Sequence, residues 1–460
     1  SLAESLPETD PLRAHAVRAL NETCNTFDPE RRRTINQCRR LIRDRLEAQV
    51  GEVSHTITPV GHAHLDTAWL WPLSVTRLKM AHTTALQLEM MERHPEYVFA
   101  HSQASQYEWL EQDHPALFQR IRQMVKKGQW EVVGSMWVEA DCNMAGGESL
   151  VRQFLYGRRY FREKFGVETH DMWLPDVFGY AASLPQILEG FGIKYFLTQK
   201  LSWNQQNKIP HNTFWWQGID GTKVWTHFPP ADTYVADAFP KVILQSVRQH
   251  RDHARSDRSL LLFGWGDGGG GPTETHLNML HRARRMPGLP AVEAKRRAVD
   301  FFAAAYEESQ DLRTWVGELY LELHRGTYTS QAANKRANRE CEFLLRDAEL
   351  LSAMAPGPYP AEALERLWKL VLLNQFHDII PGSSVREVYE DSDQDYARVR
   401  EGAEAIIAEK ITALARDFET QSGEDPVAIF HFAHVTSEAS LPWPADRETP
   451  GALVTSDEVL

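Results

Sequence analysis

Two histidines and an aspartate lie within five positions of the chain, in the stretch GHAHLDTAWLW at residues 61–71. His62, His64 and Asp66 stand at alternate positions, and alternate side chains of an extended segment point to the same side. Imidazole nitrogen and carboxylate oxygen suit Zn²⁺ or a similar divalent ion. The same spacing also fits a hydrogen-bonded pair of core histidines beside a helix-capping aspartate. The spacing alone leaves both interpretations open.

Two further aspartates follow runs of residues that are typical of buried strands. Asp176 lies in WLPDVFGY, and Asp267 lies in the glycine-rich stretch FGWGDGGGGPT. Because the carboxyl ends of parallel strands line the active site of α/β folds, we expect these carboxylates to meet His62, His64 and Asp66 at one face. Such a pair can supply a general acid and a nucleophile or base. Asp176 also fits a helix cap, and the glycine-rich stretch also fits a flexible loop.

A third polar group interrupts an apolar helix pattern at NQFHDIIPG, which contains His377 and Asp378. A histidine at the end of a helix is commonly stabilised by the helix dipole alone. Buried polar clusters nevertheless need partners, and a metal ion is one candidate partner for this imidazole.

These groups must be positioned by alternating strands and helices. Strands are predicted at 55–60, 97–102, 130–135, 170–175, 194–199, 223–228, 259–264 and 314–319, and helices at 75–94, 148–165 and 291–309. Strand–helix–strand repetition is typical of a parallel sheet. We therefore predict an α/β fold class, with a parallel barrel-like catalytic domain of seven or eight strands.

The pattern changes at about residue 330. Long helices are predicted at 330–355, 361–380 and 384–419, with breaks at prolines and glycines, and they favour a three-helix bundle. The last residues are strand-like and proline-rich. The predicted organisation is a helical segment at 1–50, the catalytic domain at 51–325, the bundle at 326–422 and the start of an incomplete β-domain at 423–460.

Charge and cysteine usage narrow the function classes. The 460 residues carry a formal net charge of −13, which disfavours nucleic acid and anionic membranes as partners and fits a neutral substrate. No apolar run approaches the ~20 residues of a membrane-spanning helix, and the first residues do not resemble a signal peptide. The four cysteines are scattered, which indicates neither a disulfide framework nor a thiolate zinc site. This usage suits a cytoplasmic protein.

Five motifs, in chain order, resemble the α-mannosidases of glycoside hydrolase family 38, and most of all the cytosolic or bacterial type. The motifs are GHAHLDTAWLWPL, WLPDVFGYAASLPQI, GWGDGGGGPT, ELYLELHRGTYTSQ and NQFHDIIPGSS. The resemblance runs over nearly the whole chain. It implies a retaining, metal-dependent exo-α-mannosidase that releases terminal α-linked mannose from oligosaccharides through a covalent glycosyl-enzyme. Family members continue into large β-domains, so we expect this chain to carry part of that architecture, and such a part can lack activity.

The same resemblance assigns roles to individual residues. Its implied metal ligands are His64, Asp66, Asp176 and His377, so His62 need not bind the ion. Asp176 would also be the nucleophile, and Asp267 best matches the acid/base. The implied substrate-binding residues are Trp69, Asp378, His324, Arg325 and Tyr328. One divalent ion, zinc first and cobalt second, would clamp the helical bundle onto the α/β domain.

Two other classes compete with this interpretation. A metal-dependent amidohydrolase or deacetylase would use both His62 and His64 as ligands and would need two further histidines at strand ends. The strand ends offer Asp176 and Asp267 instead. A carbohydrate-binding protein without turnover would not need both carboxylates. The expected partner is a mannose-containing oligosaccharide, with no nucleic acid or membrane partner, and a homo-oligomer is compatible with the sequence.

Overall fold

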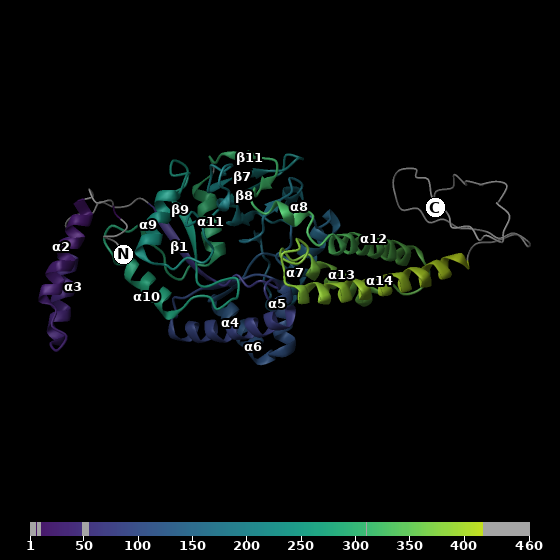
Figure 1. Ribbon diagram of the computed structural model, residues 1–460, viewed down its shortest axis with the longest axis horizontal. Helices are drawn as coiled ribbons and strands as arrows, with labels where there is room; N and C mark the ends of the chain where they lie inside the picture. Colours follow the sequence, from purple (N-terminus) through teal and green to yellow (C-terminus); the bar gives the residue numbers. More distant parts are fainter. Residues whose placement is uncertain (1–5, 7–10, 48–54, 310, 417–460) are drawn as a thin grey trace, which may run out of the picture.

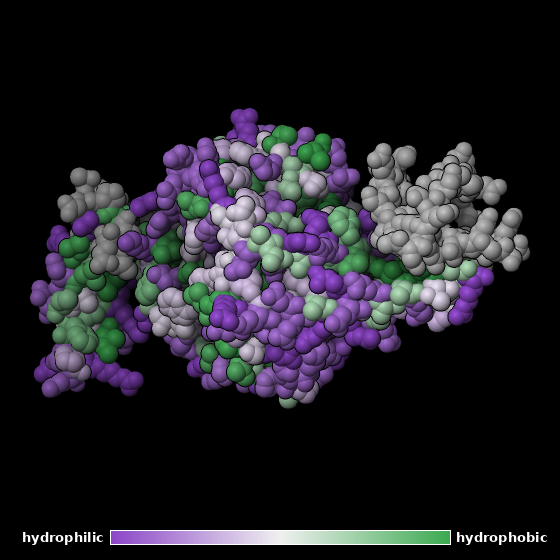
Figure 2. Space-filling view, turned by 45° about the vertical axis from the view of Figure 1, so that its right-hand side comes forward, coloured by the Kyte–Doolittle hydropathy of each residue, from purple (hydrophilic) through white to green (hydrophobic). Residues whose placement is uncertain are grey.

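The computed structural model describes residue 6 and residues 11–47, 55–309 and 311–416. Helices α2 (Pro11–Thr26) and α3 (Arg32–Glu47) pack against each other at one end of the molecule (Figure 1). Apolar residues gather on the surface of this helix pair in Figure 2, among them Val17, Leu20 and Ile35. The predicted start of a β-domain at 423–460 lies outside the described residues.

The first sheet is organised around β1 (Thr56–His62), a strand buried along almost its whole length. Its partners are all parallel: β2 (Phe99–His101), β9 (Arg258–Phe263) and, at its beginning, β10 (Ala291–Val292). Strand β3 (Trp130–Val132) continues the sheet beyond β2. Near-continuous apolar runs such as SLLLF in β9 are typical of parallel strands that are buried on both faces.

The second sheet is mixed. Its order is β11 (Thr314–Val316), β7 (Thr213–Gln217), β8 (Lys223–His227), β6 (Tyr195–Leu197) and β4 (Asp171–Trp173). Strands β7 and β8 are antiparallel, whereas the other pairs are parallel. Strand β7 was not predicted from the sequence. The five residues between β7 and β8 are too few for a parallel crossover, so these strands form a hairpin. A separate short pair joins β5 (Gly179–Tyr180) to β12 (Leu319–Tyr320).

Side chains from both sheets meet in one buried cluster. Val60 of β1, Trp173 of β4 and Trp225 of β8 pack there with Phe302 of α11 (Ala298–Glu308). The Phe302 ring lies 6.4 Å from the Trp173 ring and 6.0 Å from the Trp225 ring, in edge-on geometry. The predicted α/β class with parallel strands is confirmed. Closure into one barrel of seven or eight strands stays a prediction, because strand pairing divides the strands between two sheets.

Further helices surround the strands in Figure 1. They are α4 (Leu73–Arg93), α5 (Ala104–Asp113), α6 (Pro115–Lys127), α7 (Gly147–Phe165), α8 (Leu184–Gly190), α9 (Pro240–Gln249) and α10 (Glu274–Ala283). The helix predicted at 291–309 begins only at Ala298, because β10 pairs with β1. No helix within the described parts of the chain is long and apolar enough to cross a membrane.

Three long helices extend from the α/β body on the side opposite α2 and α3 (Figure 1). They are α12 (Ala332–Met354), α13 (Ala361–Asn374) and α14 (Arg386–Ala415), and they pack against one another. The helix predicted at 361–380 ends earlier than expected, at Asn374. The next residues pair with the α/β body instead: Asp141 N donates to Gln375 O at 2.9 Å, and His377 N donates to Glu139 O at 3.2 Å. This pairing carries His377 to the strand ends.

Candidate functional site

Four of the predicted residues converge at the carboxyl ends of the strands. His64 and Asp66 follow β1, Asp176 follows β4, and His377 follows α13. One ligand atom from each of the four side chains lies within 4.8 Å of the other three, and all four residues are buried. The fold therefore brings together side chains from three distant parts of the chain.

Both imidazoles direct the same ring nitrogen into this cluster. His64 Nε2 lies 2.9 Å from Asp66 Oδ1 and 3.9 Å from Asp176 Oδ2. His377 Nε2 lies 3.5 Å from Asp66 Oδ1 and 3.8 Å from Asp176 Oδ2. The two rings are nearly parallel, with centroids 5.4 Å apart. Two nitrogens and two carboxylate oxygens form a donor set that suits zinc and similar divalent ions.

The hydrogen bonding of His377 tests whether an ion fits. Its Nδ1 lies 2.8 Å from the carbonyl oxygen of Glu139, and because a carbonyl can only accept, Nδ1 carries a proton. Its Nε2 is buried and has no hydrogen-bond partner among the described residues. Buried nitrogens are normally paired, and metal-bound histidines commonly donate their other N–H to a carbonyl or carboxylate. The cluster can therefore hold a metal ion.

The electrostatics of the cluster favour a cation. Burial opposes a positive charge on His64, but the carboxylates of Glu139 and Asp66 raise its pKa. Burial also opposes a negative charge on Asp66, yet His64, together with His377, lowers the pKa of Asp66. Burial raises the pKa of Asp378. The carboxylates thus draw protons onto the imidazoles, and a divalent ion would replace those protons as the compensating charge.

Glu139 is a part of the cluster that the sequence analysis missed. Its Oε2 lies 3.1 Å from His64 Nδ1, its backbone oxygen accepts from His377, and its Oε1 accepts from Ser102 Oγ at 2.5 Å. One buried residue therefore contacts both imidazoles. It follows β3 by several residues in WVEAD, so the strand-end rule that selected Asp176 could have found it.

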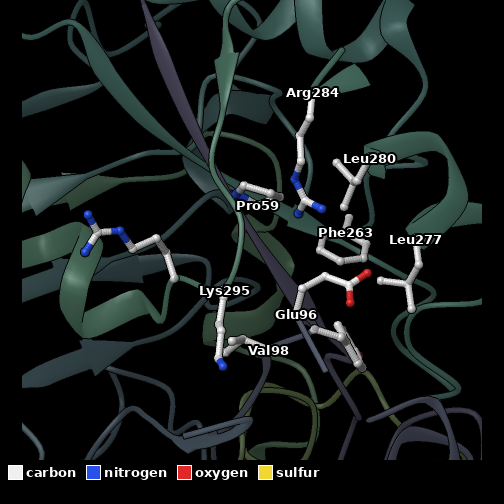
Figure 3. A pocket seen from close by; sticks show the side chains of 10 residues that line it. Pro59, Glu96, Val98, Phe263, Leu277, Leu280, Arg284 and Lys295 are labelled. Carbon is white, nitrogen blue, oxygen red and sulfur yellow. The ribbon is translucent and has the colours of Figure 1, made fainter. Parts of the chain in front are cut away.

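A cavity of about 480 Å³ opens over the cluster, within the size range of small-molecule sites. Its lining includes six predicted residues: Asp66, Trp69, Asp176, Asp267, His324 and Asp378. The hollow in Figure 3, beside β1 and α10, is lined in part by Pro59, Phe263 and Leu277 but encloses only about 10 Å³. That hollow is too small for a sugar ring.

Each candidate catalytic carboxyl group has one close polar partner. Lys200 Nζ lies 2.7 Å from Asp176 Oδ1 and 3.9 Å from the centre of the Trp203 ring. The Tyr234 hydroxyl donates to Asp267 Oδ1 at 2.9 Å. Lys200 and Tyr234 also line the cavity. Neither was predicted, because no local pattern marks the contact of a lysine or tyrosine with an aspartate that lies far away in the sequence.

The glycine-rich loop is fixed to the segment that follows β1. Asp66 N donates to the backbone oxygen of Asp267 at 2.9 Å. Asp267 itself adopts a left-handed conformation with φ of 56°, which a non-glycine residue rarely adopts. Gly264, at φ of 120°, passes so close to Pro272 that a Cβ would lie 2.5 Å from the Pro272 nitrogen. The glycines thus allow the turn that places Asp267 in the cavity wall.

Three other candidate residues lie outside the cluster and the cavity lining. His62 accepts a hydrogen bond from Trp173 Nε1 at its Nε2, 3.1 Å away, and it is not part of the four-residue cluster. The alternative that needs His62 as a ligand is therefore unsupported. Arg325 and Tyr328 lie on the short helix η2 (Arg325–Tyr328). Arg325 donates to Glu322 O and Tyr328 accepts from Asn143, and their contact with a sugar stays a prediction.

Comparisons with known proteins agree with this arrangement. The model of the glycosyl hydrolases family 38 N-terminal domain matches residues 54–318, and that of the alpha mannosidase middle domain matches residues 322–414. Human alpha-mannosidase 2C1 is 44% identical over 418 residues, which cover 90% of this chain and 40% of that protein. The alpha-mannosidase of Saccharomyces cerevisiae is 40% identical over 414 residues, which cover 84% of this chain and 38% of that protein.

The solved structures give a consistent fold. The crystal structure of an alpha-mannosidase from Enterococcus faecalis V583 superposes with a TM-score of 0.67 at 20% sequence identity, covering 79% of this chain and 43% of that chain. The present chain spans about two fifths of the length of the curated relatives named above.

Proposed function

The chain belongs to glycosyl hydrolase family 38, and from this premise we propose that its cavity hydrolyses terminal α-linked mannose from oligosaccharides with retention of configuration. One observation carries the proposal. Asp176 belongs to the buried four-residue cluster and also lines the cavity, together with a second carboxyl group, Asp267. A retaining glycosidase needs two such groups on either side of the scissile bond.

Asp176 is the nucleophile in this proposal. Its carboxylate attacks the anomeric carbon, the bond to the leaving oxygen breaks, and a glycosyl-enzyme ester forms. Lys200 Nζ, 2.7 Å from Asp176 Oδ1, holds this carboxylate in position. Its neighbours Phe178 and Trp203 add apolar surface to the cavity wall, which limits access of water to the ester.

Asp267 is the general acid and then the general base. It gives its proton to the leaving oxygen in the first step and takes a proton from the attacking water in the second, so the enzyme returns to its starting state. The Tyr234 hydroxyl fixes the position of one carboxyl oxygen of Asp267. Trp69 offers an apolar face to the sugar ring, and Asp378 and His324 offer polar contacts to its hydroxyls.

One divalent cation would be bound by His64, Asp66, Asp176 and His377. Zinc is the first expectation for its identity and cobalt the second. A bound cation would supply Lewis-acid coordination of sugar hydroxyls and charge compensation for the buried carboxylates. Because its ligands come from the segments after β1, β4 and α13, the ion would also join the α/β body to the three long helices. We further propose a cytoplasmic location, which the scattered free cysteines support.

The test is the turnover of an aryl α-mannoside by the 460-residue chain and by Asp176→Asn and Asp267→Asn. We expect Asp176→Asn to lose essentially all turnover, because no ester can form. We expect Asp267→Asn to retain the first step with an activated aryl leaving group, which needs no proton, and to accumulate the glycosyl-enzyme. Asp311→Asn is the matched control, since this side chain is fully exposed and remote from the cavity.

Nuclear magnetic resonance of the first product distinguishes the stereochemical outcome. We expect α-mannose to be released before it mutarotates. Release of β-mannose, or near-normal turnover by Asp176→Asn, would remove Asp176 as the nucleophile. An inactive wild-type chain that nevertheless binds metal would restrict the proposal to the longer family members.

A further inference from the structure

A second group of metal-ligating side chains lies at the opposite ends of the strands. His55 directly precedes β1, and His253 and Asp257 lie in the connection between α9 and β9. One ligand atom from each of these three residues lies within 4.8 Å of the other two. The seven residues of β1 span about 20 Å, so this group is separate from the cluster that contains His64.

Two buried imidazoles in this region lack a partner at one ring nitrogen. His250 Nε2 lies 2.9 Å from the carbonyl oxygen of Ser256, so Nε2 carries the proton and Nδ1 holds a lone pair. His55 Nε2 lies 2.9 Å from Ser259 Oγ. The Nδ1 atoms of both residues are buried and have no hydrogen-bond partner within the part of the chain that the structure describes. Both residues are only 3% exposed.

The rings of His55, His250 and His253 lie close to one another. The ring centroids are 5.1 Å apart for His55 and His250, 5.7 Å for His55 and His253, and 5.0 Å for His250 and His253. Three neighbouring imidazoles with two orphaned nitrogens form a costly arrangement, because buried polar atoms are normally paired. A shared cation would satisfy both nitrogens at once.

The charges around the group are compatible with a cation. Burial, and next the neighbouring histidines, lowers the pKa of His55 to about 3 and that of His250 to about 4, so both rings are neutral near pH 7. Arg258 acts on His55 as a neighbouring positive charge, and its guanidinium is paired with Glu293 at 3.1 Å and with Glu308 at 2.9 Å. Asp257 supplies a carboxylate at the exposed side of the group.

We propose that His55, His253 and Asp257 bind a second divalent metal ion. His250 lies outside this three-residue group, and a small shift of its ring would bring Nδ1 to the ion as a further imidazole ligand. Neutral imidazoles and one carboxylate favour Zn²⁺ or an ion of similar softness, and four protein ligands are typical of a structural zinc site. The hydrogen bonds of His55 to Ser259 and of His250 to Ser256 O orient these rings in the manner of metal-bound histidines.

The ion would have a structural role. His55 leads into β1, and the other ligands lie in the segment that leads into β9, which pairs with β1 along six residues. The two segments already share one hydrogen bond, from Thr56 N to Asp257 O at 2.8 Å. An ion between them would hold the beginnings of both strands together and stabilise the native state by mass action. This inference does not depend on the proposed glycosidase activity.

The test counts bound metal. The full chain is freed of metal with a chelator, loaded with Zn²⁺, dialysed and analysed for elemental zinc. We expect two equivalents in the wild type and one equivalent in His253→Ala and in Asp257→Asn. Both side chains are exposed, so these variants should fold. His281→Ala, which removes an exposed histidine on α10, is the matched control and should retain two equivalents.

Cobalt provides a second measurement of the same site. We expect the wild-type chain loaded with Co²⁺ to show a visible absorption component that His253→Ala and Asp257→Asn both lack and that His281→Ala keeps. Mannoside turnover should be unchanged in all three variants. The same zinc content and the same cobalt spectrum in the wild type and in His253→Ala would overturn the proposal.

Discussion

Glu139 offers a demanding test of the candidate metal cluster, because it contacts both imidazoles but is not one of the four candidate ligands. Its Oε2 lies 3.1 Å from His64 Nδ1, and its Oε1 accepts from Ser102. Glu139→Gln keeps the shape of the side chain but removes its charge. The amide has only one acceptor oxygen for two donors, so either His64 or Ser102 faces an NH₂ group. The backbone oxygen that accepts from His377 is unaffected.

The expected magnitude follows from this lost contact. Removing the group that orients a metal-bound histidine typically weakens metal affinity by about 10- to 100-fold, which corresponds to about 1.4–2.7 kcal/mol. We expect the dissociation constant for Zn²⁺ at the cluster to rise by this factor in Glu139→Gln. Ser102→Ala should have a smaller effect, because it removes one hydrogen bond to the carboxylate and leaves the charge beside His64 intact.

The assay is a competition titration of the zinc-loaded chain with a chelator of known affinity. Wild type, Glu139→Gln and Ser102→Ala are compared at the same pH and ionic strength, and circular dichroism verifies that each variant is folded. If Glu139→Gln binds zinc as tightly as the wild type, His64 binds the metal without help from the Glu139 carboxylate. An equal loss in Ser102→Ala would show that packing, rather than the charge of Glu139, sets the affinity.

Three further predictions concern stability. Removing metal with a chelator should lower both the midpoint of thermal unfolding and mannoside turnover, and added Zn²⁺ or Co²⁺ should restore both. The reason is that a cation that binds only the native state stabilises it. A chelated chain with an unchanged midpoint of unfolding would contradict this prediction. Gly157→Ala should lower the free energy of unfolding by about 1–3 kcal/mol in chemical denaturation, because its Cβ would lie 2.5 Å from the Met136 carbonyl carbon. The control is Gly147→Ala in the same helix, whose Cβ meets no atom within 4 Å and which should be nearly neutral. Burial lowers the pKa of His101 to about 4 and also lowers the pKa of His227, whose Nε2 accepts from Leu260 N at 3.2 Å. Below pH ~6.5 the unfolded chain therefore binds more protons than the folded chain. The free energy of unfolding should fall with decreasing pH by up to about 1.4 kcal/mol per pH unit for each histidine. Replacing His227 by Gln should reduce that slope, and an unchanged slope would exclude His227 as a contributor.

Most strands were predictable from the apolar residues of each segment alone. Each of the eight predicted strands has a counterpart, and apolar runs such as SLLLF are typical of buried parallel strands. Strand β7 was not predicted, and its antiparallel hairpin with β8 depends on the short turn between them. The end of α13 was also misplaced, since residues 375–377 pair with a segment more than two hundred residues away.

The candidate cluster was predictable for a different reason. Motifs around His64, Asp176 and His377 resemble one family in sequence, and the fold brings their ligand atoms within 4.8 Å of one another. Contacts made by ordinary residues were not predictable. Lys200 beside Asp176 and Tyr234 beside Asp267 depend on the relative placement of several strands. The histidines near the start of β1 were missed because His55, His250 and His253 come together only when β1 pairs with β9.

The central claim is that one divalent ion lies among His64, Asp66, Asp176 and His377 and joins three distant parts of the chain. The most direct measurement is a crystal structure of the zinc-loaded chain with diffraction data collected on both sides of the zinc absorption edge. We expect an anomalous peak bonded to both Nε2 atoms and to oxygens of the two aspartates, at about 2.0–2.2 Å. No anomalous peak among these four side chains, or a peak bonded to His62 instead, would contradict it.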